Sequence, residues 1–134
     1  MRFALLFAII TTAACGGKTP TTPDDPLPSP PPGATAEMVL EGRGLYRTGT
    51  CTICHGFAGK GGAGPDLTDN VFLHNSGKFE EIAEIINTGV PVEKFKSPNS
   101  SAGLFMIPRG AMAITDAQLR ALAAYVWTLS HPNG

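Results

Sequence analysis

The sequence has few cysteines, no excess of charge of either sign and no long apolar run, and each shortage excludes a class of protein. Its 134 residues include three cysteines, and ten basic residues nearly balance eleven acidic ones. Because no basic run is present, we expect no nucleic acid partner. The net charge of −1 gives no strong electrostatic steering toward a partner. The apolar run Phe3–Ile10 is too short to span a bilayer.

The first residues have the pattern of an export signal. Arg2 supplies a positive start, an apolar run follows, and the segment ends in Thr12-Ala13-Ala14-Cys15-Gly16. Small residues before a cysteine resemble a bacterial lipobox, which implies cleavage before Cys15 and a diacylglyceryl group on its sulfur. A plain signal peptide is the alternative, and it leaves Cys15 as an odd free thiol in an oxidising compartment. We expect residues 1–14 to be removed, leaving an exported, membrane-anchored lipoprotein on the periplasmic or cell-surface side.

A proline- and threonine-rich segment, residues 18–33, follows the lipobox and offers almost nothing to bury. Such a segment cannot offset its ordering entropy by packing, so we expect it to be extended and partly polyproline II. It is either a spacer that holds a domain away from a lipid anchor or a dispensable linker. We therefore predict a lipid-anchored linker over residues 15–35 and a folded domain over residues 36–134.

The folded domain is predicted to be all-α. Apolar residues favour helices over Ala36–Thr48 and Lys78–Thr88. Thr115 and Gln118 fit a capping box that opens a last helix with one apolar face. A shorter helix is expected over Leu67–Asn75, and no segment alternates as a strand does.

The pentad Cys51-Thr52-Ile53-Cys54-His55 has the C-x-x-C-H spacing that attaches a c-type haem. Two thiols three positions apart on one helical turn can add to the two haem vinyl groups, and the histidine then binds the iron on the proximal side. A structural zinc site needs four ligands, but His74 and His131 form no second pair. A thioredoxin-like motif needs a βαβ pattern, which is missing. We expect Cys51 and Cys54 to bind one haem c and His55 to bind its iron.

Residues 36–130 as a whole resemble a class I, mitochondrial-type c-type cytochrome. Part of the resemblance is Gly42 and Tyr46 in the first predicted helix, with Leu122 and Tyr125 in the last. It implies a small cytochrome c fold, in which several helices wrap around one covalently bound haem. It also implies that the first and last helices cross closely at the glycine and close the haem crevice.

The segment after the pentad resembles the same family. Gly56–Pro65 is similar to its glycine-rich loop, where glycines permit the positive φ angles that wrap backbone under the haem edge. The resemblance implies that the Pro65 carbonyl accepts a hydrogen bond from Nδ1–H of His55, which fixes the tautomer. Thr68 or Asp69 is expected to cap the short helix.

The family usually supplies a methionine as the sixth iron ligand, from a loop before the final helix. Met106-Ile107-Pro108-Arg109-Gly110 resembles that Met-Pro arrangement with one residue inserted, so Met106 is the predicted ligand. Met112 competes, but it lies three residues ahead of Thr115, which leaves little chain to bring its sulfur to the iron. His74 is a further distal candidate, although we expect it near the surface on the short helix.

For three other residues, the sequence position alone is the basis of the prediction. Arg109 is a candidate partner of a haem propionate, and Trp127 is a candidate neighbour of the haem. His131 follows the last predicted helix and has no expected role.

Motif and resemblance together predict a one-electron carrier rather than an enzyme. An iron with both axial positions filled has no open place for substrate. The expected partners are redox proteins, a respiratory complex or a terminal oxidase, with the membrane tether through Cys15 raising the effective concentration. Two alternatives stay open: a haem relay subunit of a membrane dehydrogenase or oxidase complex, and a gas-binding or peroxidase-like protein with a labile sixth ligand.

Overall fold

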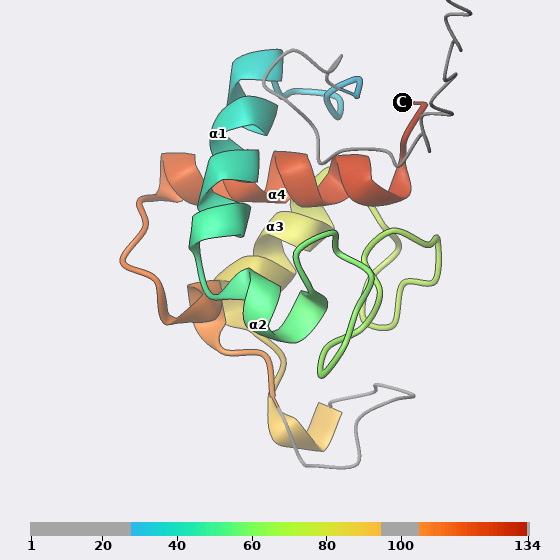
Figure 1. Cartoon of the computed structure of the whole chain (residues 1–134), viewed down its shortest axis with the longest axis vertical. Coiled ribbons are helices and arrows are strands. Elements are labelled where there is room, and N and C mark those ends of the chain that lie inside the picture. The colour runs from blue at the N-terminus through green and yellow to red at the C-terminus, as the bar shows by residue number, and fades with distance from the viewer. Residues whose placement is uncertain (1–27, 95–104, 134) are drawn as a thin grey trace, which may run out of the picture.

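The computed structural model describes residues 28–94 and 105–133, and this part of the chain is helical (Figure 1). Its four α-helices are α1 (Ala36–Thr48), α2 (Cys51–His55), α3 (Phe79–Thr88) and α4 (Asp116–Ser130). Two 3-10 helices, η1 (Val92–Lys94) and η2 (Pro108–Ala111), lie between α3 and α4. No strand forms within these ranges, and the predicted all-α class is confirmed.

Threonine side chains begin the two longest helices. Thr35 caps α1 by accepting a hydrogen bond from the backbone N–H of Met38 at 3.3 Å. At α4, Thr115 accepts from the backbone of Gln118 at 3.2 Å, and the Gln118 side chain accepts from the backbone of Thr115 at 3.0 Å. The predicted capping box is therefore confirmed. Each threonine cap stabilises its helix by about 1 kcal/mol.

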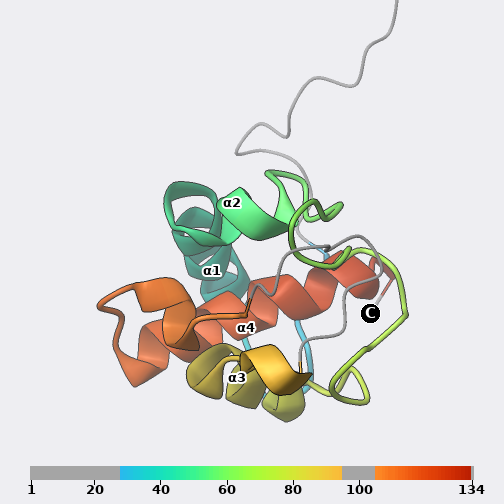
Figure 2. The same cartoon turned by 90° about the horizontal axis from the view of Figure 1, so that it is seen from below.

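Helix α4 is central, with α1 packed across one side and α3 against another (Figure 2). The crossing of α1 and α4 requires Gly42, because a Cβ there would overlap the carbonyl oxygen of Ala121 and lie 2.9 Å from Cβ of Tyr125. Tyr46 fills the space one turn further along. Its ring meets that of Tyr125 edge to face, with 5.4 Å between the centroids. The predicted crossing of the first and last helices is confirmed.

The core lies where α1 and α3 meet α4. Its buried members are Val39, Tyr46, Phe79, Ile82, Ala83, Ile86, Leu119, Leu122, Ala123, Ala124, Tyr125 and Trp127. Four of these residues also border a large cavity, namely Tyr46, Ile82, Ile86 and Leu122. The core and the cavity therefore share one wall.

The segment between α2 and α3 contains no helix, so the short helix predicted over Leu67–Asn75 is wrong. Carboxylates hold turns there instead. Asp66 accepts a hydrogen bond from the backbone N–H of Thr68 at 2.7 Å, and Asp69 accepts one from Val71 at 3.0 Å. Short polar side chains offer the backbone this alternative to a helical ladder. Thr68 and Asp69 therefore take part in turns and cap no helix.

The end of the proline-rich segment packs on the helical domain. Pro31 is almost completely buried, and its carbonyl accepts a hydrogen bond from the backbone of Ala34 at 3.0 Å. Ala34 in turn packs against the core. Residues 1–27, with the predicted signal peptide and Cys15, lie outside the described residues. In the described ranges, none of the helices has the length and apolarity needed to cross a membrane.

Candidate functional site

A cavity of about 450 Å³ lies among α2, α3, α4 and the loop that joins α2 to α3. This volume is typical of small-molecule and cofactor sites. Its wall is mostly apolar, and Cys51, Cys54 and His55 border it from α2. Met106, from the segment just before η2, borders the same cavity. The fold thus brings all four predicted site residues to one cavity.

The ring of His55 is held in one orientation by the loop that follows it. Its Nδ1 lies 3.0 Å from the Pro65 carbonyl oxygen, as the resemblance implied. A carbonyl only accepts, so Nδ1 carries the proton and Nε2 keeps its lone pair. Gly64 lies against the ring, since a Cβ there would be 3.0 Å from Nδ1 and Cε1. Burial lowers the pKa of His55, which favours the neutral, metal-binding form at pH 7.

The glycine-rich loop folds back on α2 because its glycines take positive φ angles. These reach 75° at Gly56 and 85° at Gly61, where a side chain would be strained. The backbone N–H of Gly61 donates to the carbonyl of His55 at 2.8 Å. From α1, the Tyr46 hydroxyl donates to the carbonyl of Gly56 at 2.8 Å. The position of α2 is therefore fixed from both the loop and α1.

The two candidate methionines have different surroundings. Met106 borders the cavity and forms an antiparallel bridge with Val90, in which each backbone N–H donates to the other residue's carbonyl at 2.9 Å. Met112 does not border the cavity. Its sulfur lies against Gly49, in the space that a Cβ at that glycine would occupy. Of the two methionines, Met106 is therefore the one that lines the cavity.

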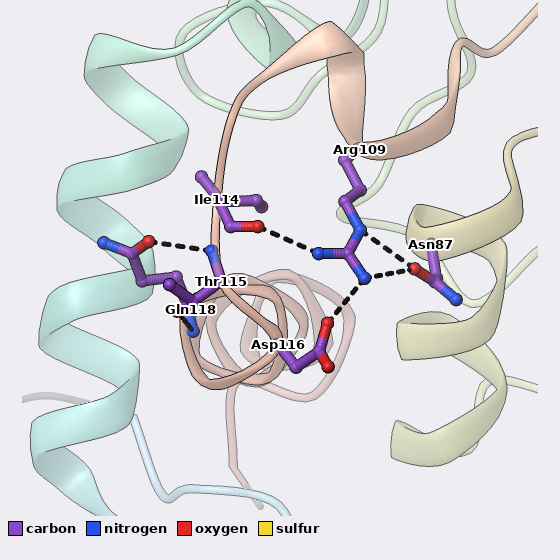
Figure 3. Close-up of polar contacts among 6 residues, drawn as sticks. All are labelled: Asn87, Arg109, Ile114, Thr115, Asp116 and Gln118. Atoms are coloured by element: carbon purple, nitrogen blue, oxygen red, sulfur yellow. Dashed lines mark hydrogen bonds and ion pairs between the residues drawn. The ribbon is translucent and has the colours of Figure 1, made fainter.

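Arg109 borders the cavity, but its guanidinium group binds protein acceptors (Figure 3). Nε and Nη2 donate to Oδ1 of Asn87 at 2.9 and 2.8 Å, and Nη1 donates to the carbonyl of Ile114 at 2.8 Å. Nη2 also donates to Oδ1 of Asp116 at 2.6 Å. These contacts commit the guanidinium to α3 and to the start of α4, so the expected pairing with a haem propionate is not supported.

Trp127 and His131 pair with each other at the end of α4. Their rings stack with 4.0 Å between centroids and 4° between planes, and Nδ1 of His131 donates to the carbonyl of Trp127 at 2.9 Å. Neither residue borders the cavity, so the expectation that Trp127 lies beside the haem is not supported. His131 also stacks on Phe72, a cavity residue, at 6.1 Å. His131 therefore supports the cavity wall through Phe72.

The cavity wall also includes His74, the further distal candidate, and several residues that had no predicted role. His74 borders the cavity from the loop before α3 and is half-buried, not on a helix near the surface as expected. Thr50 also borders it, and its hydroxyl donates to the carbonyl of Gly110 at 2.6 Å. Because Thr50 directly precedes Cys51, the sequence could have indicated that Thr50 lies at the site, and this was missed. Val90 and Phe105 also line the wall, but no sequence motif indicates this, because tertiary folding brings them there.

With this geometry established, comparison with known families becomes informative. The family model described as cytochrome c oxidase, cbb3-type, subunit III matches residues 37–126, about two thirds of the chain. The chain belongs to this family. No curated protein and no solved structure matches it significantly.

The family assignment makes the chain a c-type cytochrome with covalently bound haem c, whose function is electron transfer. Cytochrome c domains are generally extracytoplasmic. The cavity of this cytochrome fits the cofactor, because its wall is apolar, two thiols border it from one helical turn, and Nε2 of His55 is free to bind iron.

Proposed function

We propose that this cytochrome is a monohaem, class I electron carrier tethered to a bacterial membrane. The observation that carries the proposal is the meeting of Cys51, Cys54, His55 and Met106 at one apolar cavity. Haem bound there would supply one-electron exchange at its iron. With His55 and Met106 both bound to the iron, the site would leave no open position for a substrate.

Each residue of α2 has a distinct part in this proposal. Cys51 and Cys54 would hold the porphyrin through thioethers, each formed by adding S–H across a vinyl double bond. His55 presents Nε2 to the iron, since Nδ1 is occupied by the Pro65 carbonyl. That hydrogen bond fixes the ring and raises the basicity of the ligand nitrogen.

In this proposal Met106 would supply the second protein ligand to the iron. Its bridge to Val90 holds its backbone at the cavity wall, where its side chain would bind the iron. A thioether ligand raises the reduction potential relative to harder ligands. The apolar wall contributed by Ile82, Ile86 and Leu122 excludes water and disfavours the additional charge of Fe(III).

The identity of the sixth ligand is tested by a matched pair of variants. Met106→Ala should abolish the weak far-red sulfur-to-iron absorption band, lower the potential and let the reduced protein bind carbon monoxide. Met112→Ala should keep the band, because that sulfur lies against Gly49. Visible spectra and a redox titration of the holoprotein measure both effects. A band that survives in Met106→Ala and disappears in Met112→Ala would give the role to Met112.

The same spectra address the gas-binding alternative and His74. A wild-type protein that binds carbon monoxide rapidly at neutral pH would have an accessible iron and would favour a gas-binding or peroxidase-like role. If the wild-type protein shows no far-red band and also fails to bind carbon monoxide, the distal ligand is not a sulfur, and His74 is the wall residue to replace next.

We further propose that a lipid on Cys15 attaches the cytochrome to the membrane. The proline-rich segment before Pro31 then acts as the spacer. Cys15→Ser should move the haem protein from the membrane fraction to the soluble fraction after cell lysis, with an unchanged visible spectrum. Persistent membrane association of this variant would contradict the lipid anchor.

A terminal oxidase is the proposed partner, because the matching family is described as a subunit of a cbb3-type oxidase. Two arrangements are open, a tethered shuttle and a haem relay subunit bound within a complex. Mild detergent extraction followed by size-exclusion chromatography separates them. A subunit elutes with the oxidase haems, whereas a shuttle elutes alone and reduces added oxidase.

A further inference from the structure

We infer that Arg109 is a positioning residue that keeps the Met106 loop, residues 105–114, closed over the cavity so that the Met106 sulfur stays on the iron. The inference rests on the proposed role of Met106 as the sixth ligand. It assigns Arg109 a part in holding the distal ligand and none in binding the haem carboxylates.

The hydrogen bonds of Arg109 join the Met106 loop to two helices (Figure 3). Nε and Nη2 converge on one oxygen of Asn87 in α3, and Nη1 binds the carbonyl of Ile114 at the far end of the same loop. A planar guanidinium can make these bonds together, whereas an ammonium group cannot. Asp116, in α4, adds an ion pair at 2.6 Å.

These contacts are unequal in strength. The Asp116 side chain is 87% exposed, so solvent screens its ion pair with Arg109 and the pair contributes little. The bonds to Asn87 and to the Ile114 carbonyl are partly buried. The loop is therefore held mainly by the two neutral acceptors, which predicts a rank order among variants.

The backbone of the turn also requires support. Arg109 and Ala111 take φ angles of 54° and 57°, and Gly110 between them takes 61°. Non-glycine residues in this left-handed region are strained and persist only where the surroundings hold them. Besides the Arg109 contacts, the Thr50 hydroxyl holds the turn through its bond to Gly110.

The turn controls one of two anchors of Met106. On its N-terminal side, Met106 is held by the bridge to Val90, and Gly89 allows the close approach because a Cβ there would overlap the Met106 carbonyl oxygen. On its C-terminal side, the chain reaches the strained turn after Pro108. If Arg109 released the turn, the Val90 bridge, the Thr50 bond and the packing of Met112 on Gly49 would remain, and the Met106 sulfur would leave the iron more often.

Carbon monoxide binding to the reduced holoprotein measures how often the sixth position opens. In Arg109→Ala and Asn87→Ala we expect the open fraction, and hence the binding rate, to rise about tenfold or more, because a charge-assisted hydrogen bond is worth at least that factor. The far-red band should weaken in parallel. Arg109→Lys should not restore it, and Asp116→Asn should stay close to wild type.

Arg120→Ala is the matched control. Arg120 also joins α4 to α3, through Glu80 at 2.8 and 2.9 Å, but no hydrogen bond or ion pair recorded for its guanidinium reaches the Met106 loop. It should therefore leave carbon monoxide binding unchanged. Should Arg109→Ala fail to fold, Asn87→Ala removes two of the same hydrogen bonds and keeps the test decisive.

The inference and the proposed function fail in different ways. If Met106→Ala loses the far-red band but Arg109→Ala and Asn87→Ala match wild type, Met106 remains the ligand and the inference about Arg109 is wrong. Full rescue by Arg109→Lys would also overturn it, since charge alone would then be sufficient. If Met106→Ala keeps the band, the proposed ligand itself is wrong.

Discussion

Tyr46 connects the packing of the core to the geometry of the haem motif. The residue is fully buried, its ring meets Tyr125 edge to face, and its hydroxyl donates to the carbonyl of Gly56, directly after His55. A hydrophobic side chain would preserve the packing and lose the bond that holds the end of α2. The hydroxyl therefore serves the position of the proximal ligand as well as stability.

The pH dependence of stability tests this hydroxyl. Burial raises the pKa of Tyr46 above its ordinary value of 10.0, so the folded protein retains a proton that the unfolded chain releases. Its contribution is complete below the unfolded-state pKa and is lost as the pH rises through the folded-state pKa. Tyr46→Phe should lower the free energy of unfolding by about 1 kcal/mol at neutral pH. It should also flatten the loss of stability above pH ~10.

Denaturant unfolding of the two holoproteins at neutral and alkaline pH provides the measurement. The two curves of stability against pH should converge as the pH rises, because only the wild type loses the contribution of Tyr46. Curves that stay parallel would contradict a titrating role for this residue.

At the scale of helices and loops, elements governed by local rules were predictable. The bounds of α1 match the prediction, and α3 begins one residue later than expected, after Lys78. The start of α4 is fixed by the capping box of Thr115 and Gln118, whose members are three residues apart. Helical periodicity and capping act over a few residues, so a single sequence contains the information they need.

Segments whose structure depends on distant contacts were not predictable. The turn around Arg109 places non-glycine residues at positive φ, which no local propensity favours, and its support comes from Asn87 in another helix. The helix predicted before α3 is wrong because the side chains of Asp66 and Asp69 accept backbone hydrogen bonds and hold turns there. The stack of Trp127 and His131 could have been predicted from the sequence, because residues four apart lie on the same side of a helix.

The candidate site also contains residues whose grouping local rules predict and a residue whose place depends on distant contacts. Cys51, Cys54 and His55 lie within five consecutive residues, so one short helix brings them to one cavity, and their grouping was predictable. Met106 reaches that cavity only through its bridge to Val90, sixteen positions earlier, which the sequence does not reveal. The family pattern favoured Met106 over Met112, and the short chain between Met112 and Thr115 supported the same choice.

At the scale of the whole molecule, the cofactor and the core are one structure. Tyr46, Ile82, Ile86 and Leu122 each belong to both the buried core and the cavity wall. The domain is small, and small domains bury a limited fraction of their apolar surface. The haem therefore completes the core in addition to carrying the electron.

Removal of the haem should unfold most of the domain. Without the haem, a cavity of about 450 Å³ would separate residues of the core, and protein interiors tolerate such voids poorly. A Cys51→Ser/Cys54→Ser double variant, which cannot form thioethers, should lose most of its helical far-ultraviolet circular dichroism. Met106→Ala is the matched control, because it removes one ligand but keeps the haem attached, and it should stay folded. A haem-free double variant with wild-type helical content and a cooperative unfolding transition would show that the helices need no cofactor to pack.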